Sequence, residues 1–314
     1  MSLNFLFFFF IIFLLTDFLI KICLPSMGSY FLDIPNERSA HSFPKLKSGG
    51  IFILLVVSIV NIVDIFLNGS TQISQIIIVC SLMSLIGLID DFLNLSSKFR
   101  YLIQLLISLF IIKIAASDLL GYESILYLFT FIILGTAIIN LVNFMDGLDG
   151  LLSGCVLPLF IFTFFREPSI QLIALTGSTL AFLKWNWEPS KIFLGDCGSN
   201  FLGAAIFYLI ISNNSEIDHK AIFLIFPLLV DSSFTVIRRF INKENIFIAH
   251  KKHLYQRLFQ AGINHWKISS FYILMCTINF LILLKDSLLL FSFVMVVESF
   301  ILLYLDKFIA KQYK

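Results

Sequence analysis

Five aspartates at the ends of long apolar runs are the residues of this chain best suited to chemistry. Asp90 and Asp91 are adjacent, Asp146 and Asp149 are three residues apart, and Asp196 stands between a glycine and a cysteine. A charged side chain inside a bilayer costs roughly 2.5–3.5 kcal/mol even on the mildest scale, so this concentration of acids indicates function. Carboxylates hold Mg²⁺, which neutralises charge on phosphates during their transfer. The acids therefore predict metal-assisted phosphoryl transfer.

The densest polar stretch, residues 140–150, reads Asn-Leu-Val-Asn-Phe-Met-Asp-Gly-Leu-Asp-Gly. If Gly147 opens a helix, Asp146 and Asp149 project from one face of its first turn. An ordinary helix cap is the alternative, but it accounts for one acid and not for Asn140 and Asn143. We interpret the stretch as part of a functional site.

The adjacent acids Asp90 and Asp91 follow the apolar run that ends at Ile89. Adjacent carboxylates raise each other's proton affinity unless a cation or a base neutralises them. The pair therefore indicates a bound metal ion or proton handling, with a structural pairing to a lysine as the alternative. Lys98 and Arg100 follow closely enough to pair with these acids or with a phosphate.

Asp196 lies within Phe-Leu-Gly-Asp-Cys-Gly-Ser, residues 193–199, where glycines surround a predicted helix start. Glycines allow a close approach to the backbone, and a carboxylate there suits a Mg²⁺ ion that bridges phosphates. Phe193 offers a ring to a base, although packing in the membrane is its alternative role in a chain with 37 phenylalanines.

Cationic and imidazole groups gather in two further loops. His250, His253 and Arg257 share one face at i, i+3 and i+7 if their segment is helical. A zinc pair would lack a third ligand, so contacts to a diphosphate fit better. The first loop supplies further groups that face anions or hold anionic lipid headgroups: Arg38, His41, Lys45 and Lys47.

The composition excludes a soluble domain. Of the 314 residues, 59% are hydrophobic and only 13% are charged, and the mean hydropathy is +0.95, whereas a soluble chain carries about 25% charged residues. The net charge of +2 gives no sign of nucleic-acid binding. Five scattered cysteines favour neither a zinc site nor a disulfide framework.

Apolar runs of about 17–22 residues predict an all-α, polytopic integral membrane protein with eleven transmembrane helices in a single domain, residues 1–314. The first run lacks a basic start and a cleavage site, so we expect it to be retained as a span. The spans lie near 4–23, 49–67, 74–90, 101–118, 123–141, 149–165, 169–186, 199–212, 219–240, 267–284 and 287–305.

Lysine and arginine predict the orientation, because they accumulate in cytoplasmic loops. With eleven spans, one set of loops collects most of these residues and the other has only Lys113, Arg166, Lys220 and Lys285. The N-terminus is therefore expected outside and the C-terminus in the cytoplasm. The same cytoplasmic loops (24–48, 90–100, 142–149, 187–198 and 241–266) carry all the motifs above, which predicts a cytoplasmic active site.

In their order and spacing, these motifs resemble the polyprenyl-phosphate N-acetylhexosamine-1-phosphate transferases, a family that includes the phospho-N-acetylmuramoyl-pentapeptide translocase. The resemblance extends from Asp33 to Arg257 and is carried by Asp90-Asp91, residues 143–150 and residues 193–199. It implies an enzyme that requires Mg²⁺, with Mn²⁺ as a substitute. Such an enzyme transfers a sugar 1-phosphate from a UDP-N-acetylhexosamine to undecaprenyl phosphate and releases UMP. It also implies membrane lipid around the protein and suggests a homodimer.

The resemblance implies roles for the same residues. Asp90 and Asp91 are expected near the carrier phosphate, with one of them as a base, and Asp196 is expected to hold the metal. Asn143 is expected to assist as a second metal ligand. The expected substrate contacts are Asn140, Asn143, Asp146, Asp149, Phe193, Arg100, Lys47 and Arg257. His250 and His253 are expected to be catalytic.

The loop from His250 to Arg257 narrows the subfamily. Its His-x-x-His-x-Tyr-Gln-Arg pattern is similar to that of the O-antigen and related polysaccharide-initiating members, and the translocase's consecutive histidines are absent. The first loop has Pro44-Lys-Leu-Lys where relatives show Pro-x-Pro-Arg, so Lys47 keeps the charge without the planar fork of arginine. The absence of a long insertion between spans nine and ten favours a bacterial inner-membrane enzyme.

The sequence leaves the mechanism, the donor sugar, the identity of the base and the class of function open. The reaction proceeds either by direct attack of the carrier phosphate on the donor or in two steps through a covalent aspartyl phosphate. The sequence identifies neither the donor sugar nor which of Asp90 and Asp91 is the base. A cation- or proton-coupled transporter that uses the acids as a relay is the alternative function. Transporters of that kind carry acids near the middle of spans and have repeated halves, whereas these acids lie at helix ends.

Overall fold

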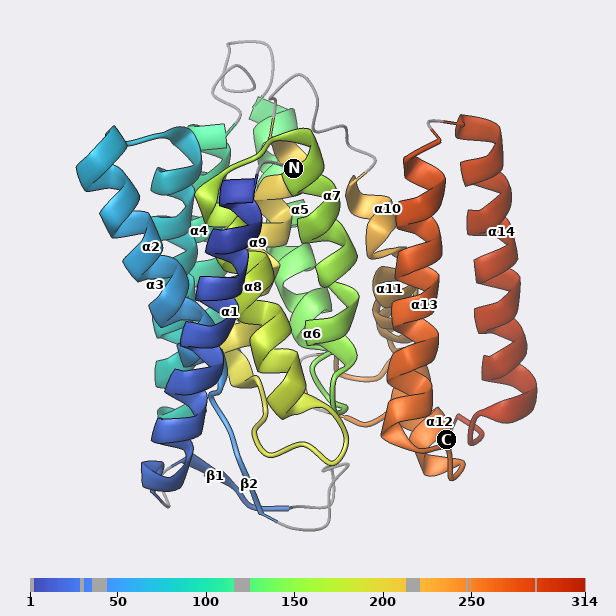
Figure 1. The fold of residues 1–314 in the computed structure, drawn as a ribbon. Coiled ribbons are helices and arrows are strands. Elements are labelled where there is room, and N and C mark those ends of the chain that lie inside the picture. The colour runs from blue at the N-terminus through green and yellow to red at the C-terminus, as the bar shows by residue number, and fades with distance from the viewer. Residues whose placement is uncertain are drawn as a thin grey trace.

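The computed structural model is a bundle of helices with one small sheet at one end (Figure 1). It describes residues 3–28, 31–35, 44–115, 125–212, 221–246, 248, 250–285 and 287–313. The first-loop candidates Arg38 and His41 lie outside the described residues. The helices are α1 (Leu3–Cys23), α2 (Gly50–Asn68), α3 (Gln72–Leu93), α4 (Ser97–Ala115), α5 (Ile125–Asn143), α6 (Leu151–Cys155), α7 (Leu157–Arg166), α8 (Ile170–Asn186), α9 (Gly195–Ile211), α10 (Ala221–Leu224), α11 (Phe226–Ile241), α12 (Leu254–Gln260), α13 (His265–Leu283) and α14 (Leu288–Tyr304). Short 3-10 and π turns, η1 (Leu24–Ser26) and η4 (Leu305–Ile309), follow α1 and α14.

Each of the eleven predicted ranges coincides with helix. Nine are single helices, and two are interrupted, by Val156 between α6 and α7 and by Ile225 between α10 and α11. A proline follows each interruption in the first turn of the next helix, Pro158 and Pro227, where its missing N–H costs nothing. The prediction of an all-α, multi-pass membrane protein is confirmed. By length and apolarity six helices of the described chain qualify as spans, with Leu151–Arg166 and Gly195–Ile211 as shorter apolar segments, so the count of eleven and the orientation stay predictions.

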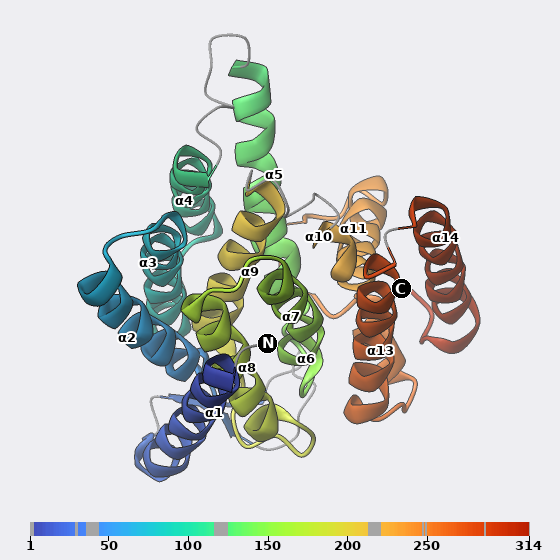
Figure 2. The same cartoon turned by 45° about the horizontal axis from the view of Figure 1, so that its top comes forward.

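The centre of the bundle is α9, most of whose residues are buried. Figure 2 shows α3, α4 and α5 around it, and α13 and α14 at the far edge. Small residues allow the closest approach, as at Gly87 of α3, where any side chain would collide with the backbone of Asp196. The packing of α3 on α9 therefore brings Asp90 and Asp91 to the first turn of α9.

The outer helices expose apolar side chains. Phe7 and Phe10 of α1 and Phe293 and Phe300 of α14 are more than half exposed, as expected for residues that face lipid. Apolar surface of this extent on a soluble protein would cause aggregation.

A small sheet organises the end of the bundle that carries the motifs. Strand β1 (Leu32–Asp33) pairs antiparallel with β2 (Lys45–Leu46), and Leu46 also bridges Ile192. The Phe193 N–H donates to the Leu46 carbonyl at 2.7 Å, and the Gly49 N–H donates to the Phe193 carbonyl at 2.8 Å. The first loop is thereby fixed against residues 192–194, directly before α9.

Candidate active site

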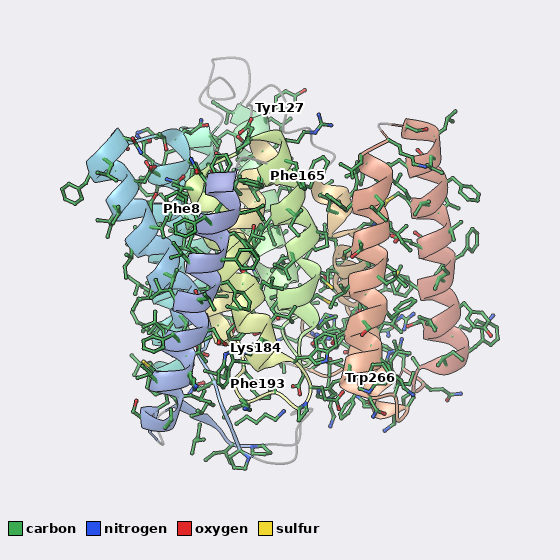
Figure 3. All side chains as sticks on the ribbon, in the orientation of Figure 1. Phe8, Tyr127, Phe165, Lys184, Phe193 and Trp266 are labelled. Carbon is green, nitrogen blue, oxygen red and sulfur yellow. The ribbon has the colours of Figure 1, made fainter. Side chains whose placement is uncertain are left out.

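A cavity of about 620 Å³ opens at the end of the bundle where the loops meet. Figure 3 places Phe193, Lys184 and Trp266 at this end, and Phe8, Tyr127 and Phe165 at the other. All five motif-bearing loops contribute to the lining, which consists of Asp33, Lys47, Asp90, Asp91, Asn94, Leu95, Arg100, Asp146, Gly147, Leu148, Asp149, Asn186, Phe193, Gly195, Asp196, Lys251, Gln256, Phe259, Gln260 and His265. The five acids singled out in the sequence thus share one cavity.

Asp90 is held by the loop that follows it. Its carboxylate accepts from Arg100 Nη1 at 2.8 Å and from the Leu95 N–H at 2.7 Å. The same Arg100 nitrogen lies 3.8 Å from Asp196 Oδ2. Because Arg100 is about one third exposed on the cavity, its charge is shared between two acids and remains accessible to an anion.

Asp91 caps a helix that belongs to another part of the chain. Its carboxylate accepts from the N–H groups of Asp196 at 3.2 Å and Cys197 at 3.3 Å, and from Ser48 Oγ at 2.8 Å. An acid at a helix N-terminus satisfies free N–H groups and complements the helix dipole. Lys47 Nζ donates to the Asp91 backbone carbonyl, so its charge stands beside the acid pair. Asp91 therefore orients the helix that carries Asp196.

Asp196 reaches the cavity from the first turn of α9, with a side chain 31% exposed. Gly195 before it has φ +73°, in the left-handed region that favours glycine. The Asn143 amide N–H donates to Asp196 Oδ1 at 3.0 Å and lies 3.4 Å from Asn200 Oδ1. Asn143 therefore stands behind Asp196 and fixes its carboxylate, while its role as a metal ligand stays a prediction.

The stretch from 144 to 150 is not a helix. Residues 144–150 form turns, and α6 begins only at Leu151, so the prediction that Asp146 and Asp149 share a first helical turn is wrong. Tyr255 Oη donates to the Phe144 carbonyl at 2.9 Å, and its ring lies against Gly147, where a side chain would collide with it. Tertiary contact, which the local sequence does not reveal, determines the backbone here.

The two acids of this turn have opposite surroundings. Burial raises the pKa of Asp146 well above its usual value, and the nearby carboxylates of Asp196 and Asp91 raise it further. Burial alone would also raise the pKa of Asp149, but contacts with His265, the Ser190 N–H and Lys45 outweigh it and lower that pKa. Asp146 thus belongs to an acidic part of the cavity, and Asp149 to a neutralised part.

Lys45 links the neutralised part to the predicted aromatic contact. Its Nζ lies 3.1 Å from Asp149 Oδ2, donates to Ser190 Oγ at 2.8 Å and stands 5.0 Å from the centre of the Phe193 ring. Asn186 Oδ1 accepts from the Gly150 N–H at 3.1 Å. Asn186 and His265 were missed in the sequence, because nothing local to either of them signals a contact with residues 149–150.

Five predicted site residues do not line the cavity, among them Asn143, which lies behind Asp196. Asn140 exchanges amide hydrogen bonds with Gln104 of α4 at 2.6 and 3.3 Å. His250 lies before α12, and His253 is its N-cap residue, only 2% exposed. Arg257 is 3% exposed and pairs with Asp306. The expected helical face of His250, His253 and Arg257 is therefore wrong, because only Arg257 lies within the helix.

The two histidines also lack the expected charge. Burial, together with the nearby Arg239, lowers the pKa of His250 to about 4, and burial, together with His250 and Arg239, lowers that of His253 to about 3. The His253 ring packs against those of His250, Phe144 and Tyr255, with centroids 4.8–5.7 Å apart. Both histidines are neutral near pH 7 and support the turn at 144–150 by packing. Of the cationic residues of this loop, Lys251 lines the cavity.

The fold and the cavity define a multi-pass membrane protein with an acidic site at one end of its helices. Residues 73–214 match the family model of glycosyl transferase family 4. The chain is 28% identical to a probable undecaprenyl-phosphate N-acetylglucosaminyl 1-phosphate transferase of Bacillus subtilis, over 74% of this chain and 71% of that protein. It is 34% identical to an undecaprenyl-phosphate alpha-N-acetylglucosaminyl 1-phosphate transferase of Thermotoga maritima, over 44% of each chain. It is 35% identical to a phospho-N-acetylmuramoyl-pentapeptide-transferase of Dictyoglomus thermophilum, over 44% of this chain and 47% of that protein.

The match of residues 73–214 to glycosyl transferase family 4 agrees with the resemblance that the motifs predict. The family model begins at α3 and ends just after α9. It therefore includes all five acids and the helix pair that brings them together. In the Thermotoga and Dictyoglomus proteins the match spans less than half of the relative's length.

Proposed function

We propose that this protein transfers an N-acetylhexosamine 1-phosphate from a UDP-sugar to undecaprenyl phosphate. The relatives named above act on undecaprenyl phosphate or transfer a sugar phosphate by their names. The observation that carries the proposal is a polar cavity lined by five acids at one end of the membrane helices, where a lipid-borne phosphate can meet a water-soluble donor.

The carrier phosphate is best received by the side of the cavity that holds Asp90, Arg100 and Lys47. There two cations lie beside the acid pair at the end of α3. In the proposed step, a carrier phosphate oxygen bonds to the β-phosphorus of the donor, and the bond from that phosphorus to the bridging oxygen breaks. UMP leaves with the bridging oxygen, and the lipid retains a diphosphate sugar. Because the carrier phosphate is the nucleophile, no oxidant or further reactant is needed.

A magnesium ion fits the acidic part of this cavity. Among the described residues no three His, Cys, Asp or Glu side chains are placed to hold an ion without help, but Mg²⁺ in such enzymes takes one or two carboxylates and substrate phosphates. Asp196 and Asp146 repel each other, which a cation would relieve. When bound, the ion would neutralise charge on the diphosphate. Manganese has the same preference for oxygen ligands.

The neutralised part of the cavity suits the nucleotide. Phe193 lines the cavity and offers a ring for stacking on a base, while Lys45 at 5.0 Å from the ring centre adds positive charge. Asp149 is already paired with Lys45, so it brings no net charge against a donor that is itself anionic. We assign this side to uridine and the sugar to the space between the two parts.

Orientation and pathway complete the proposal. The loop charges favour a cytoplasmic cavity, where UDP-sugars would reach it. We therefore place the protein in a bacterial inner membrane, at the first step of a cell-surface polysaccharide such as O-antigen. N-acetylglucosamine and its deoxy relatives differ by groups worth about 1–3 kcal/mol, so the donor has to be determined by assay.

The test is UMP release by the purified protein in detergent, with undecaprenyl phosphate, Mg²⁺ and a panel of UDP-N-acetylhexosamines. One donor should release UMP in a carrier-dependent manner, and the lipid product should carry its sugar. Release of UMP without carrier would indicate a covalent enzyme intermediate in place of direct attack. No carrier-dependent release with any UDP-sugar would contradict the proposal.

A further inference from the structure

One wall of the cavity is a helix too short to be stable alone. Helix α12 has seven residues, whereas isolated helices shorter than about 12–15 residues are marginal in water. Its residues Gln256, Phe259 and Gln260 line the cavity. Their positions therefore depend on what holds the two ends of α12.

The N-terminal end is held by a buried acid of α11. Asp231 accepts from the N–H groups of Leu254 at 2.7 Å and Tyr255 at 3.0 Å, and from Tyr272 Oη at 2.8 Å. This is a cap supplied by another helix, which satisfies the free N–H groups of the first turn.

The C-terminal end is held by the segment that follows α14. In this segment, residues 305–313, the Lys311 N–H donates to the Arg257 carbonyl at 3.1 Å, and Arg257 Nη1 donates to the Lys311 carbonyl at 2.8 Å. Figure 1 shows this end of the chain beside α12. The pairing is reciprocal, so the segment fixes both the backbone and the side chain at Arg257. We call residues 305–313 the strap.

Asp306 is the charged centre of the strap. It accepts two bonds from Arg238 of α11, at 2.6 and 3.3 Å, and pairs with Arg257. Its side chain is only 14% exposed and that of Arg257 is 4% exposed. One carboxylate therefore compensates two largely buried guanidinium groups, which makes the charge of Asp306 hard to replace.

Tyr313 connects the strap to the loop between α11 and α12. Its ring lies 4.8 Å from the Arg238 guanidinium and 4.8 Å from Lys252 Nζ, within cation–π range. Its hydroxyl lies 3.2 Å from Glu244 Oε1, which also pairs with Lys252. Residues on both sides of His250 are therefore held by the same segment.

We propose that the strap is a positioning element that holds α12 against the cavity and thereby sets the affinity for the nucleotide sugar. The inference rests on the proposed function for the identity of the ligand, and on the contacts above for the mechanical link. Asp306 and Arg257 act through α12 and do not touch the ligand. Helices α11 and α14 are thereby coupled to substrate binding, although α14 contributes no residue to the cavity lining.

The test is Asp306→Asn in the full chain, because an amide cannot compensate two guanidinium groups. We expect the KM for the UDP-sugar to rise about 10-fold with kcat within about twofold, as a displaced binding wall would produce. Backbone amides of residues 254–260 should exchange with deuterium faster, and those of α9 should not. Asp306→Glu, which keeps the charge, should restore most of the affinity. Lys307→Gln, an exposed neighbour, is the matched control and should behave like the wild type.

Tyr313→Ala tests the strap more gently, because this side chain is partly exposed and its loss leaves the charged centre intact. We expect about a threefold rise in KM and faster exchange at residues 250–256. Unchanged KM and unchanged exchange at 254–260 in Asp306→Asn would overturn the proposal, as would a loss of kcat with KM unaltered. If the wild type transfers no sugar phosphate, the proposed function fails, and the exchange measurement still decides the mechanical link.

Discussion

Asp146 and Asp149 lie in one turn, three residues apart, but differ in their neighbours and in the direction in which their pKa values are shifted. Asp146 faces Asp196 and Asp91, and burial together with these carboxylates raises its pKa well above the usual value. Asp149 is 2% exposed, and despite this burial its contacts with His265, the Ser190 N–H and Lys45 lower its pKa. The turn between α5 and α6 thus separates the cavity into two parts.

The difference shows which part of the cavity carries negative charge that the protein does not compensate. The charge of Asp149 is compensated by Lys45 and by its other partners within the protein, so these contacts offset the free-energy cost of burying it. The acids around Asp146 have Arg100 as their direct ion-pair partner, and the excess negative charge favours a divalent cation. Pairs of acids whose surroundings drive their pKa values apart commonly have different roles in an active site. We infer that the first part handles the transferring phosphates and the second holds the nucleotide.

The largest expected effect comes from the acidic part. Asp196→Asn should lower kcat by about 10³-fold or more at saturating Mg²⁺, because it removes a charge that would hold the ion against the diphosphate. UMP release by the detergent-solubilised protein measures it. Asp17→Asn is the control, since Asp17 pairs with Lys184 and Trp185 and does not line the cavity. Full activity of Asp196→Asn would remove the metal assignment.

A smaller effect is expected where an acid acts through a helix. Asp91→Asn places an amide opposite the N–H groups of Asp196 and Cys197 and should lower kcat by about 10²-fold, because α9 shifts at its first turn. Asparagine keeps one acceptor oxygen, so the cost in stability should be less than the roughly 1 kcal/mol of a fully lost cap. Ser48→Ala removes only one bond to the same carboxylate and should cost far less. Equal losses from both changes would show that Asp91 does not act through α9.

The pH dependence of activation by Mg²⁺ should be determined by the acids around Asp146. Because the pKa of Asp146 is raised, its charge is completed only as pH rises above the usual range of a carboxyl group. The Mg²⁺ concentration for half-maximal UMP release should therefore fall as pH increases, and Asp146→Asn should weaken this dependence. Asp149→Asn should preserve it. A dependence that survives in Asp146→Asn and disappears in Asp149→Asn would reverse the comparison.

The smallest effect is expected from the loop behind the turn. His250→Gln should leave kcat within about threefold of the wild type, because His250 does not line the cavity and its pKa near 4 leaves it neutral. The matched change is Lys251→Gln, which alters a residue of the cavity lining and should raise the KM for the donor. A loss of about 10²-fold in His250→Gln would point to direct contact with substrate.

The helices were predictable because long apolar runs have only one satisfactory backbone conformation in lipid. All eleven ranges coincide with helix for that reason. The acids of the cavity were also predictable, since charge at the end of an apolar run is costly unless used. The structure of residues 144–150 was not predictable, because Tyr255, more than one hundred residues away, determines it.

The fifth loop shows the same limit. The spacing of His250, His253 and Arg257 suggests one helical face, but α12 begins only at Leu254, where Asp231 caps it. Asp231 and Asp306 carry no local motif, and their roles emerge only from residues brought together by α11, α13 and α14. Sequence identifies groups that are costly to place in a membrane, whereas their pairing is decided by tertiary contact.

Thermal unfolding of Asp146→Asn and Asp149→Asn at neutral pH without divalent cations tests the division of the cavity most directly. A raised folded-state pKa contributes stability at low pH that is lost as pH rises through it, so at neutral pH ionised Asp146 is a cost. A lowered pKa contributes stability above the usual carboxyl pKa that is lost as pH falls through the folded value, so at neutral pH Asp149 stabilises. We predict that the Tm of Asp146→Asn rises and that of Asp149→Asn falls, each by about 2–4 °C, and that Mg²⁺ stabilises the wild type more than Asp146→Asn. Shifts of the same sign in both variants would contradict the account.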